Sequence, residues 1–90
     1  MIIELKKFGN TLISRQAGRE ALAAFQPTLQ DISATETIEI DFDGVLTFSP
    51  SWADEFLTPL RNEFGSRVIL HETSNPSVRV SLEILDENRG

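Results

Sequence analysis

Hydrophobic and polar residues alternate over residues 37–43, and this period of two predicts a β-strand. After Pro50 the apolar residues recur every three or four positions, which predicts an amphipathic helix over residues 51–64. The junction between the two is therefore a strand, a turn and a helix start. The apolar side of the strand carries Ile38, Ile40 and Phe42, and the apolar stripe of the helix carries Trp52, Phe56, Leu57, Leu60 and Phe64.

A strand and a helix are also predicted before this junction. Residues 2–8 are expected to form the first strand, and a turn at Gly9 leads into a short second run at residues 11–13. Ser14 can cap a helix that follows, and Pro27 is expected to kink that helix or end it early. The stripe of this helix carries Ala17, Ala21, Leu22, Phe25 and Leu29.

A third strand and helix are predicted after residue 65. The polar segment 31–36 is expected to be a loop, and residues 67–72 have the continuous apolar centre of a well-buried strand. Asn75 followed by Pro76 is typical of a helix start, so residues 77–85 are interpreted as a helix. A strand would instead align Val78, Val80, Leu82 and Ile84, whereas a helix gives one face to Val78, Leu82 and Leu85.

Alternating strands and helices predict the α/β class, with a mixed but mostly parallel sheet of about four strands and about three helices. A parallel strand covered on both sides would be apolar on both. The strand at 37–43 is polar on one side, so the helices are expected chiefly on one face of the sheet. We expect one domain over residues 1–90, with residues 86–90 as a flexible tail. The polar side of the strand carries Thr37, Glu39, Asp41 and Asp43.

Composition and charge remove several classes of function. The net charge of −6 opposes nucleic-acid binding, and no apolar run approaches the length of a membrane span or signal peptide. The absence of cysteine excludes disulfides and thiolate metal sites and fits a cytoplasmic protein. Alternate strand positions lie about 6.8 Å apart, so Glu39, Asp41 and Asp43 are interpreted as a solvated face and not a magnesium site. Neither a catalytic constellation nor a cofactor motif is expected.

The residues at the junction resemble the STAS-like domain of unknown function. That family shows an Asp-Phe-x-x-Val strand followed by a helix that begins near Ala-Asp-Glu-Phe, and both are similar to residues 41–45 and 53–56 here. Residues 9–15 are similar to its Gly-x-x-Leu-x-Ser-Arg stretch, and the region of Asn75 to its asparagine-rich turn. The resemblance implies the STAS fold of anti-sigma factor antagonists and sulfate-transporter tails, with helices on one side of a mixed sheet.

The resemblance also implies a regulatory serine. In the anti-sigma factor antagonists a GHKL-type kinase phosphorylates a serine in an Asp-Ser-Ser-Gly turn at the start of the second helix. That serine corresponds to Ser51. The aspartate of the turn is replaced by Ser49, while Pro50 and Trp52 stand where the family has a small polar residue and a glycine.

Two interpretations of the turn remain open at this point. Ser51 can be a plain helix cap, with Asp54 three residues later completing a capping box, or it can be a site for phosphate or a partner. Trp52 can be a core residue or an interface anchor. The candidate partner surface is Ser49, Ser51, Trp52, Asp54 and Glu55.

We therefore expect a non-catalytic regulatory module that binds a protein partner, such as a GHKL-type ATPase or kinase. One alternative is a module that binds a small ligand or nucleotide at the start of the second helix. Another is a structural subunit that forms homodimers through the open sheet face or an edge strand.

Overall fold

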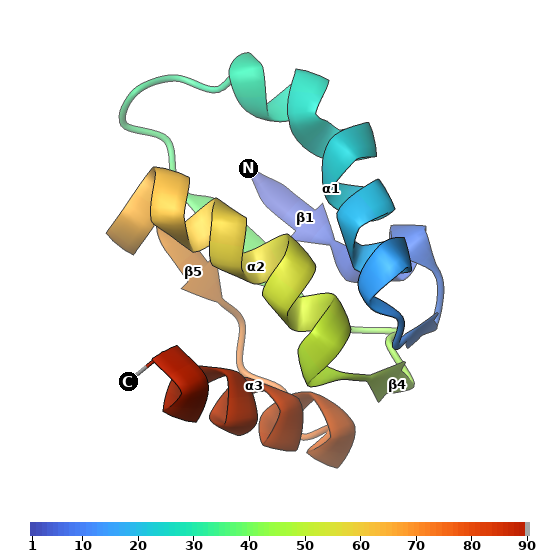
Figure 1. The fold of residues 1–90 in the computed structure, drawn as a ribbon. Coiled ribbons are helices and arrows are strands. Elements are labelled where there is room, and N and C mark those ends of the chain that lie inside the picture. Colours follow the sequence, from blue (N-terminus) through green and yellow to red (C-terminus); the bar gives the residue numbers. More distant parts are fainter. Residues whose placement is uncertain (90) are drawn as a thin grey trace.

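The computed structural model describes the backbone of residues 1–89 and the side chains of residues 1–87. Three α-helices and five short strands alternate along the chain, with two short 3₁₀ helices between them (Figure 1). In chain order the elements are β1 (Ile2–Glu4), the 3₁₀ helix η1 (Leu5–Phe8), β2 (Thr11–Leu12), α1 (Arg15–Gln30), β3 (Ile38–Asp41), β4 (Thr47–Phe48), α2 (Pro50–Phe64), the 3₁₀ helix η2 (Gly65–Arg67), β5 (Val68–Leu70) and α3 (Pro76–Arg89).

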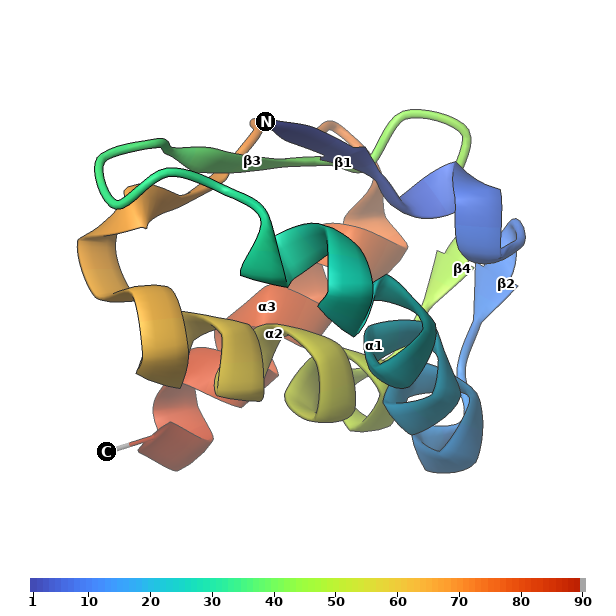
Figure 2. The same ribbon diagram turned by 90° about the horizontal axis from the view of Figure 1, so that it is seen from above.

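The strands form two separate parallel sheets. One has the order β1-β3-β5 and the other pairs β2 with β4. All three helices lie on one side of the larger sheet, and no helix within residues 1–89 covers its other side (Figure 2). The predicted α/β class with helices chiefly on one face is confirmed, with five strands in two sheets in place of about four in one.

The strand register explains which side faces the helices. Ile3 of β1 and Ile40 of β3 are register partners, and both are buried against the helices. Glu39 and Asp41 point the other way and remain partly exposed. The predicted polar face of this strand is therefore the open face of the sheet.

The core is built around the crossing of α1 and α2. Trp52 of α2 stacks on Phe56 at a centroid distance of 4.9 Å, and Phe8 of η1 lies 5.4 Å from the Phe56 ring. Gly18 of α1 allows the close approach, because a Cβ added there would lie 2.7 Å from the carbonyl oxygen of Trp52. The stripe predicted for the second helix is thus the side that packs into the core.

Two helix starts follow the sequence prediction. Ser14 accepts a hydrogen bond from the Ala17 amide at 3.0 Å and caps α1. Asn75 accepts one from the Ser77 amide at 2.8 Å, with Pro76 as the first residue of α3. Residues 77–85 are therefore helical, as predicted, and not a strand.

Three predicted boundaries are wrong. The first strand ends at Glu4, and residues 5–8 turn into η1, which buries Leu5. Pro27 does not end α1, which continues to Gln30 because Leu29 in its last turn is buried in the core. The tail predicted over residues 86–90 is helical through position 89, and Arg61 pairs with Asp86 at 3.1 Å; residue 90 lies outside the described residues.

The prediction of a well-buried third strand is also wrong. β5 lies at the edge of the larger sheet, and Ile69 at its centre is 44% exposed because it points to the open face. Only Val68 and Leu70 pack against the core. No helix formed by residues 1–89 has both the length and the apolar content needed to cross a membrane.

Candidate functional site

The cap of α2 is Ser49 and not Ser51. The Ser49 hydroxyl oxygen accepts a hydrogen bond from the Trp52 amide at 3.1 Å, and α2 begins at Pro50. Ser51 is the second residue of the helix, where a side chain does not cap it. The interpretation of Ser51 as the plain cap is wrong, and so is the proposed capping box with Asp54.

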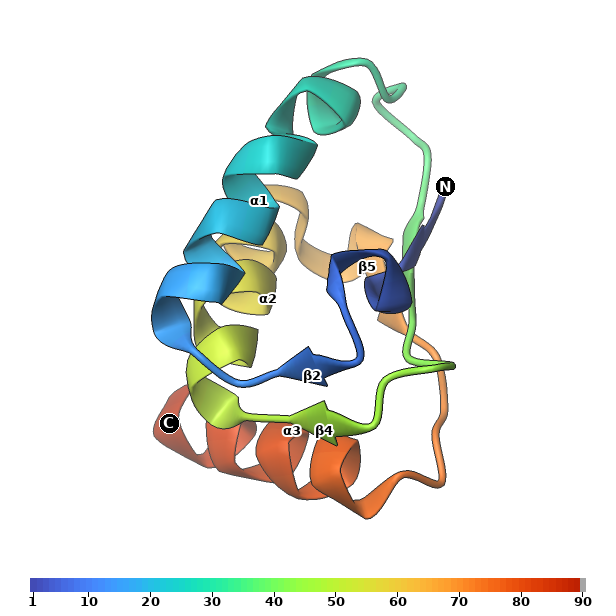
Figure 3. The same ribbon diagram turned by 90° about the vertical axis from the view of Figure 1, so that its right-hand side faces the viewer.

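Tertiary contacts select Ser49 for this role. β4 pairs with β2 just before the helix, and α3 lies along β4 (Figure 3). The Ser49 amide donates to the Leu12 carbonyl at 3.0 Å, and its hydroxyl donates to the Ile13 carbonyl at 2.6 Å. Both bonds extend the β2–β4 pairing by one residue. Ser49 is thus held in extended geometry at the point where the chain must turn into the helix.

Ser51 is left at the molecular surface. It is partly exposed, and its side chain makes no hydrogen bond with the other described residues. It lines a hollow of about 360 Å³ with Arg15, Pro50, Asp54 and Leu85. The hydroxyl therefore lies beside both a cation and a carboxylate.

Trp52 is not part of the surface. Its side chain is 0% exposed and packs among Phe8, Phe48 and Phe56. Its indole N–H is buried without a hydrogen-bond partner among the described residues. The interpretation of Trp52 as an interface anchor is wrong, and its role is to fix the first turn of α2 from the inside.

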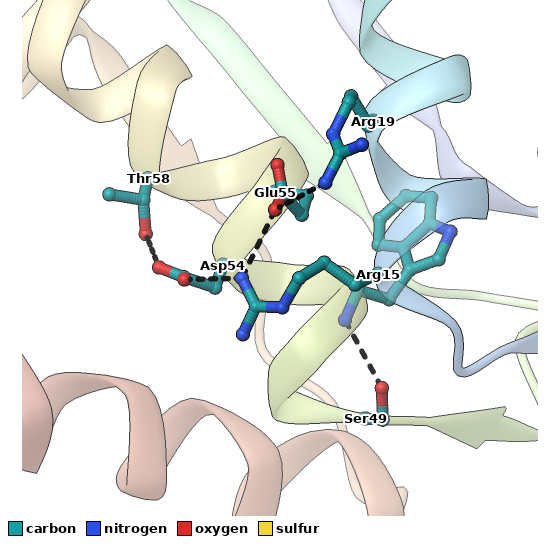
Figure 4. A network of polar contacts seen from close by, with 7 residues as sticks. Arg15, Arg19, Ser49, Asp54, Glu55 and Thr58 are labelled. Carbon is teal, nitrogen blue, oxygen red and sulfur yellow. Dashed lines mark hydrogen bonds and ion pairs between the residues drawn. The ribbon is translucent and has the colours of Figure 1, made fainter.

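Asp54 and Glu55 belong to an ion-pair network between α1 and α2 (Figure 4). Arg15 Nη1 lies 2.9 Å from Asp54 Oδ2 and 3.1 Å from Glu55 Oε1. Arg19 Nη2 lies 3.4 Å from the same Glu55 oxygen, and the Thr58 hydroxyl donates to Asp54 Oδ1 at 2.8 Å. The structure therefore brings together the first two turns of α1 and the second turn of α2.

Each charged group in this network stabilises the ionised form of its partners. The hydrogen bonds from Arg15, and then from Thr58, lower the pKa of Asp54 below its usual value. Those from Arg15 and Arg19 lower the pKa of Glu55, and the two acids together raise the pKa of Arg15. All three groups are therefore ionised at neutral pH.

Sequence reasoning missed Arg15 and Arg19 as members of this surface. Arg15 appeared only as a motif residue after the cap of α1, and Arg19 follows it one helical turn later. Their spacing of four places both on one face of a helix. The spacing was visible in the sequence, but the pairing with acids about 36–40 residues away depends on how the two helices cross.

A family comparison connects this geometry to known proteins. The family model described as a STAS-like domain of unknown function matches residues 22–79, which is more than half of the chain. The chain belongs to this family. The match begins within α1 and spans β3, β4, α2 and β5, so it includes the turn before α2. Neither the curated proteins nor the solved structures gave a significant match.

This STAS-like domain has a second and larger hollow, of about 520 Å³, between α3 and the segment that follows β5. It is lined by the segment after β5, including His71 and Thr73, and by Arg79 of α3. His71 lies just beyond the end of β5, and its Nε2 is 2.9 Å from Glu39 Oε1. Within residues 1–89 no three acidic, histidine or cysteine side chains are grouped so as to hold a metal ion.

Proposed function

We propose that this STAS-like domain is a non-catalytic regulatory module that binds a protein partner over the first turn of α2. The observation that supports this most is the division of roles between two serines. Ser49 caps the helix, so Ser51 is not needed for capping and presents a partly exposed hydroxyl beside a hollow. A hydroxyl in that position is accessible to a partner or to a kinase.

The proposed contact surface differs from the one inferred from sequence. Ser51, Asp54 and Glu55 remain part of it, and Arg15 joins them through its ion pairs. Trp52 is excluded because it is buried. The surface is therefore polar and charged, which suits a reversible contact whose strength depends on salt.

Phosphorylation of Ser51 would change this surface directly. A phosphate brings a charge of about −1.5 to −2 and strong acceptor oxygens. Ser51, Arg15 and Asp54 line the same hollow, so the phosphate would compete with Asp54 for the Arg15 guanidinium and repel that carboxylate. The expected result is a rearranged surface on an intact fold, which is how a switch at this turn would operate.

The resemblance to anti-sigma factor antagonists suggests the kind of partner, a GHKL-type ATPase or kinase. A nucleotide or small anion at the same helix start is less favoured. Pro50 has no N–H group, and the Trp52 and Ala53 amides already donate to Ser49. Few backbone donors remain there for an anion, and Asp54 and Glu55 lie close by.

The test is titration of the domain against a purified GHKL-type ATPase of the source organism, with Ser51→Asp and Ser51→Ala in parallel. Ser51→Asp should weaken binding by about tenfold or more while melting close to the parent. Ser51→Ala should bind as the parent does, because it adds no charge. Incubation with the ATPase and ATP, followed by mass spectrometry, should place a phosphate on Ser51.

Ser66→Asp is the matched control, because Ser66 is an exposed serine in η2, away from α2's first turn. It adds the same charge and should leave binding unchanged. Equal binding by all of these variants would refute the proposed role of Ser51. Equal weakening by Ser66→Asp would show a general charge effect and no site.

A further inference from the structure

The open face of the larger sheet has a defined pattern of side chains. Ile2, Glu39 and Ile69 are register partners across β1, β3 and β5 and form one row. Glu4 and Asp41 form the next row, which His71 extends just beyond β5. Because registered partners in a parallel sheet point to the same side, these six side chains form one surface, which we call the open sheet face.

This face is unusual for a parallel sheet. All-parallel sheets normally have both faces covered, because the crossover connections place helices on each. Here all three helices lie on the same side (Figure 2). Ile2 and Ile69 are consequently 55% and 44% exposed, although they lie on paired strands. Two exposed isoleucines on either side of a glutamate are a small apolar surface available for burial.

The charge on the face indicates what can cover it. Glu4, Glu39 and Asp41 all lie on it, and the Lys7 Nζ is 3.9 Å from Glu4 Oε2. His71 faces Glu39 across the strands at 2.9 Å. The face is therefore acidic between two apolar positions, within a chain whose net charge is −6.

We propose that the open sheet face docks a basic amphipathic helix of a partner protein. Ile2 and Ile69 are separated by two strand spacings, or about 10 Å, which is close to the rise of two turns of a helix that lies along this row. The apolar stripe of such a helix covers the two isoleucines. Its lysines and arginines lie over the acidic side chains, which gives the complementary potential of a specific contact.

A second copy of this chain suits the face poorly. Packing two open sheet faces together would bring Glu4, Glu39 and Asp41 of one copy against the same acids of the other. Like charges brought together in this way disfavour association. The docking surface is also separate from the proposed switch, because Ser51 belongs to α2, and α2 lies on the other side of the sheet (Figure 2).

The probe for the test is a synthetic amphipathic peptide of about 14 leucines and lysines, roughly 20 Å long as a helix. It is titrated at low salt into the isotope-labelled domain and followed by NMR. The largest shifts should fall on the amides of β1, β3 and β5. A peptide with glutamate in place of lysine should not bind.

Matched variants distinguish binding of the peptide at the open sheet face from its non-specific attraction to an acidic protein. Glu39→Lys should weaken peptide binding by about tenfold, whereas Glu83→Lys, on exposed α3, should change it less than about twofold. Ile69→Thr should also weaken binding, and Val80→Thr, an exposed β-branched residue on α3, should not.

Several results would overturn the proposal. Shifts spread evenly over the domain, or equal weakening by Glu39→Lys and Glu83→Lys, would show non-specific attraction. A parent protein that sediments as a dimer through this face would make a second copy the occupant. Ser51→Asp should leave peptide binding unchanged, so the outcome here is distinct from that of the proposed switch.

Discussion

Replacing Gly18 by alanine tests the crossing of α1 and α2 that positions the site. Intrinsic helix propensity alone favours alanine over glycine by about 1 kcal/mol. Packing opposes it, because the new Cβ would lie 2.7 Å from the Trp52 carbonyl oxygen and 3.2 Å from the Trp52 Cα. These are backbone atoms of α2, which cannot rotate away, so the two helices must separate.

Overpacking of a core typically costs about 1–3 kcal/mol, and more where nothing can yield. The fixed backbone atoms place this site in the upper part of that range, at about 2–3 kcal/mol, so after the gain in propensity Gly18→Ala should be less stable by about 1–2 kcal/mol. For a domain of this size that lowers the melting temperature by roughly 4–16 °C. Moving the two helices apart should also lengthen the ion pair between Arg15 and Asp54, because this pair lies about one helical turn from the crossing.

The assay is urea unfolding followed by the fluorescence of Trp52, the single tryptophan of the chain. Ala23→Gly, at an exposed position of α1, is the control for propensity and should cost about 1 kcal/mol. A Gly18→Ala protein as stable as the parent, or more stable, would show that α1 and α2 do not approach this closely.

Three further predictions concern the core, the cap and the charges. Phe56→Ala should cost about 3–5 kcal/mol, because a fully buried ring is lost, and calorimetry should show a melting temperature at least 12 °C lower or so. Ser49→Ala should lower the free energy of unfolding in urea by about 1 kcal/mol, and Ser51→Ala should lower it much less. If Ser51 were the cap, the order of the two losses would be reversed. Since arginine pairing lowers the pKa values of Asp54 and Glu55 in the folded state, it stabilises the fold above their unfolded pKa values of about 4, and that stability is lost as pH falls through the folded values. Arg15→Gln should therefore lower the melting temperature at pH 7, and lower it progressively less as the pH falls below about 4, whereas an equal loss at every pH would contradict the pairing.

The sequence by itself determined the features that depend on neighbours along the chain. The caps at Ser14 and Asn75, the apolar stripe of α2 and the polar side of β3 were predicted and are present. A cap needs a side chain one turn from its amide, and a face needs only a repeating period. The polar side of β3 was sufficient to predict that the helices would gather on one side of the sheet.

Only the tertiary structure decided the composition of the site. Whether Ser49 or Ser51 caps α2 depends on the residue at which the extended geometry of β4 ends. That residue is set by the pairing of β4 with β2, which lies about 36 residues earlier in the chain. The partners of Asp54 were likewise set by a helix crossing through Gly18. Contacts between segments far apart in the chain leave no local period, so the sequence pattern around α2 could not distinguish the capping serine from the exposed one.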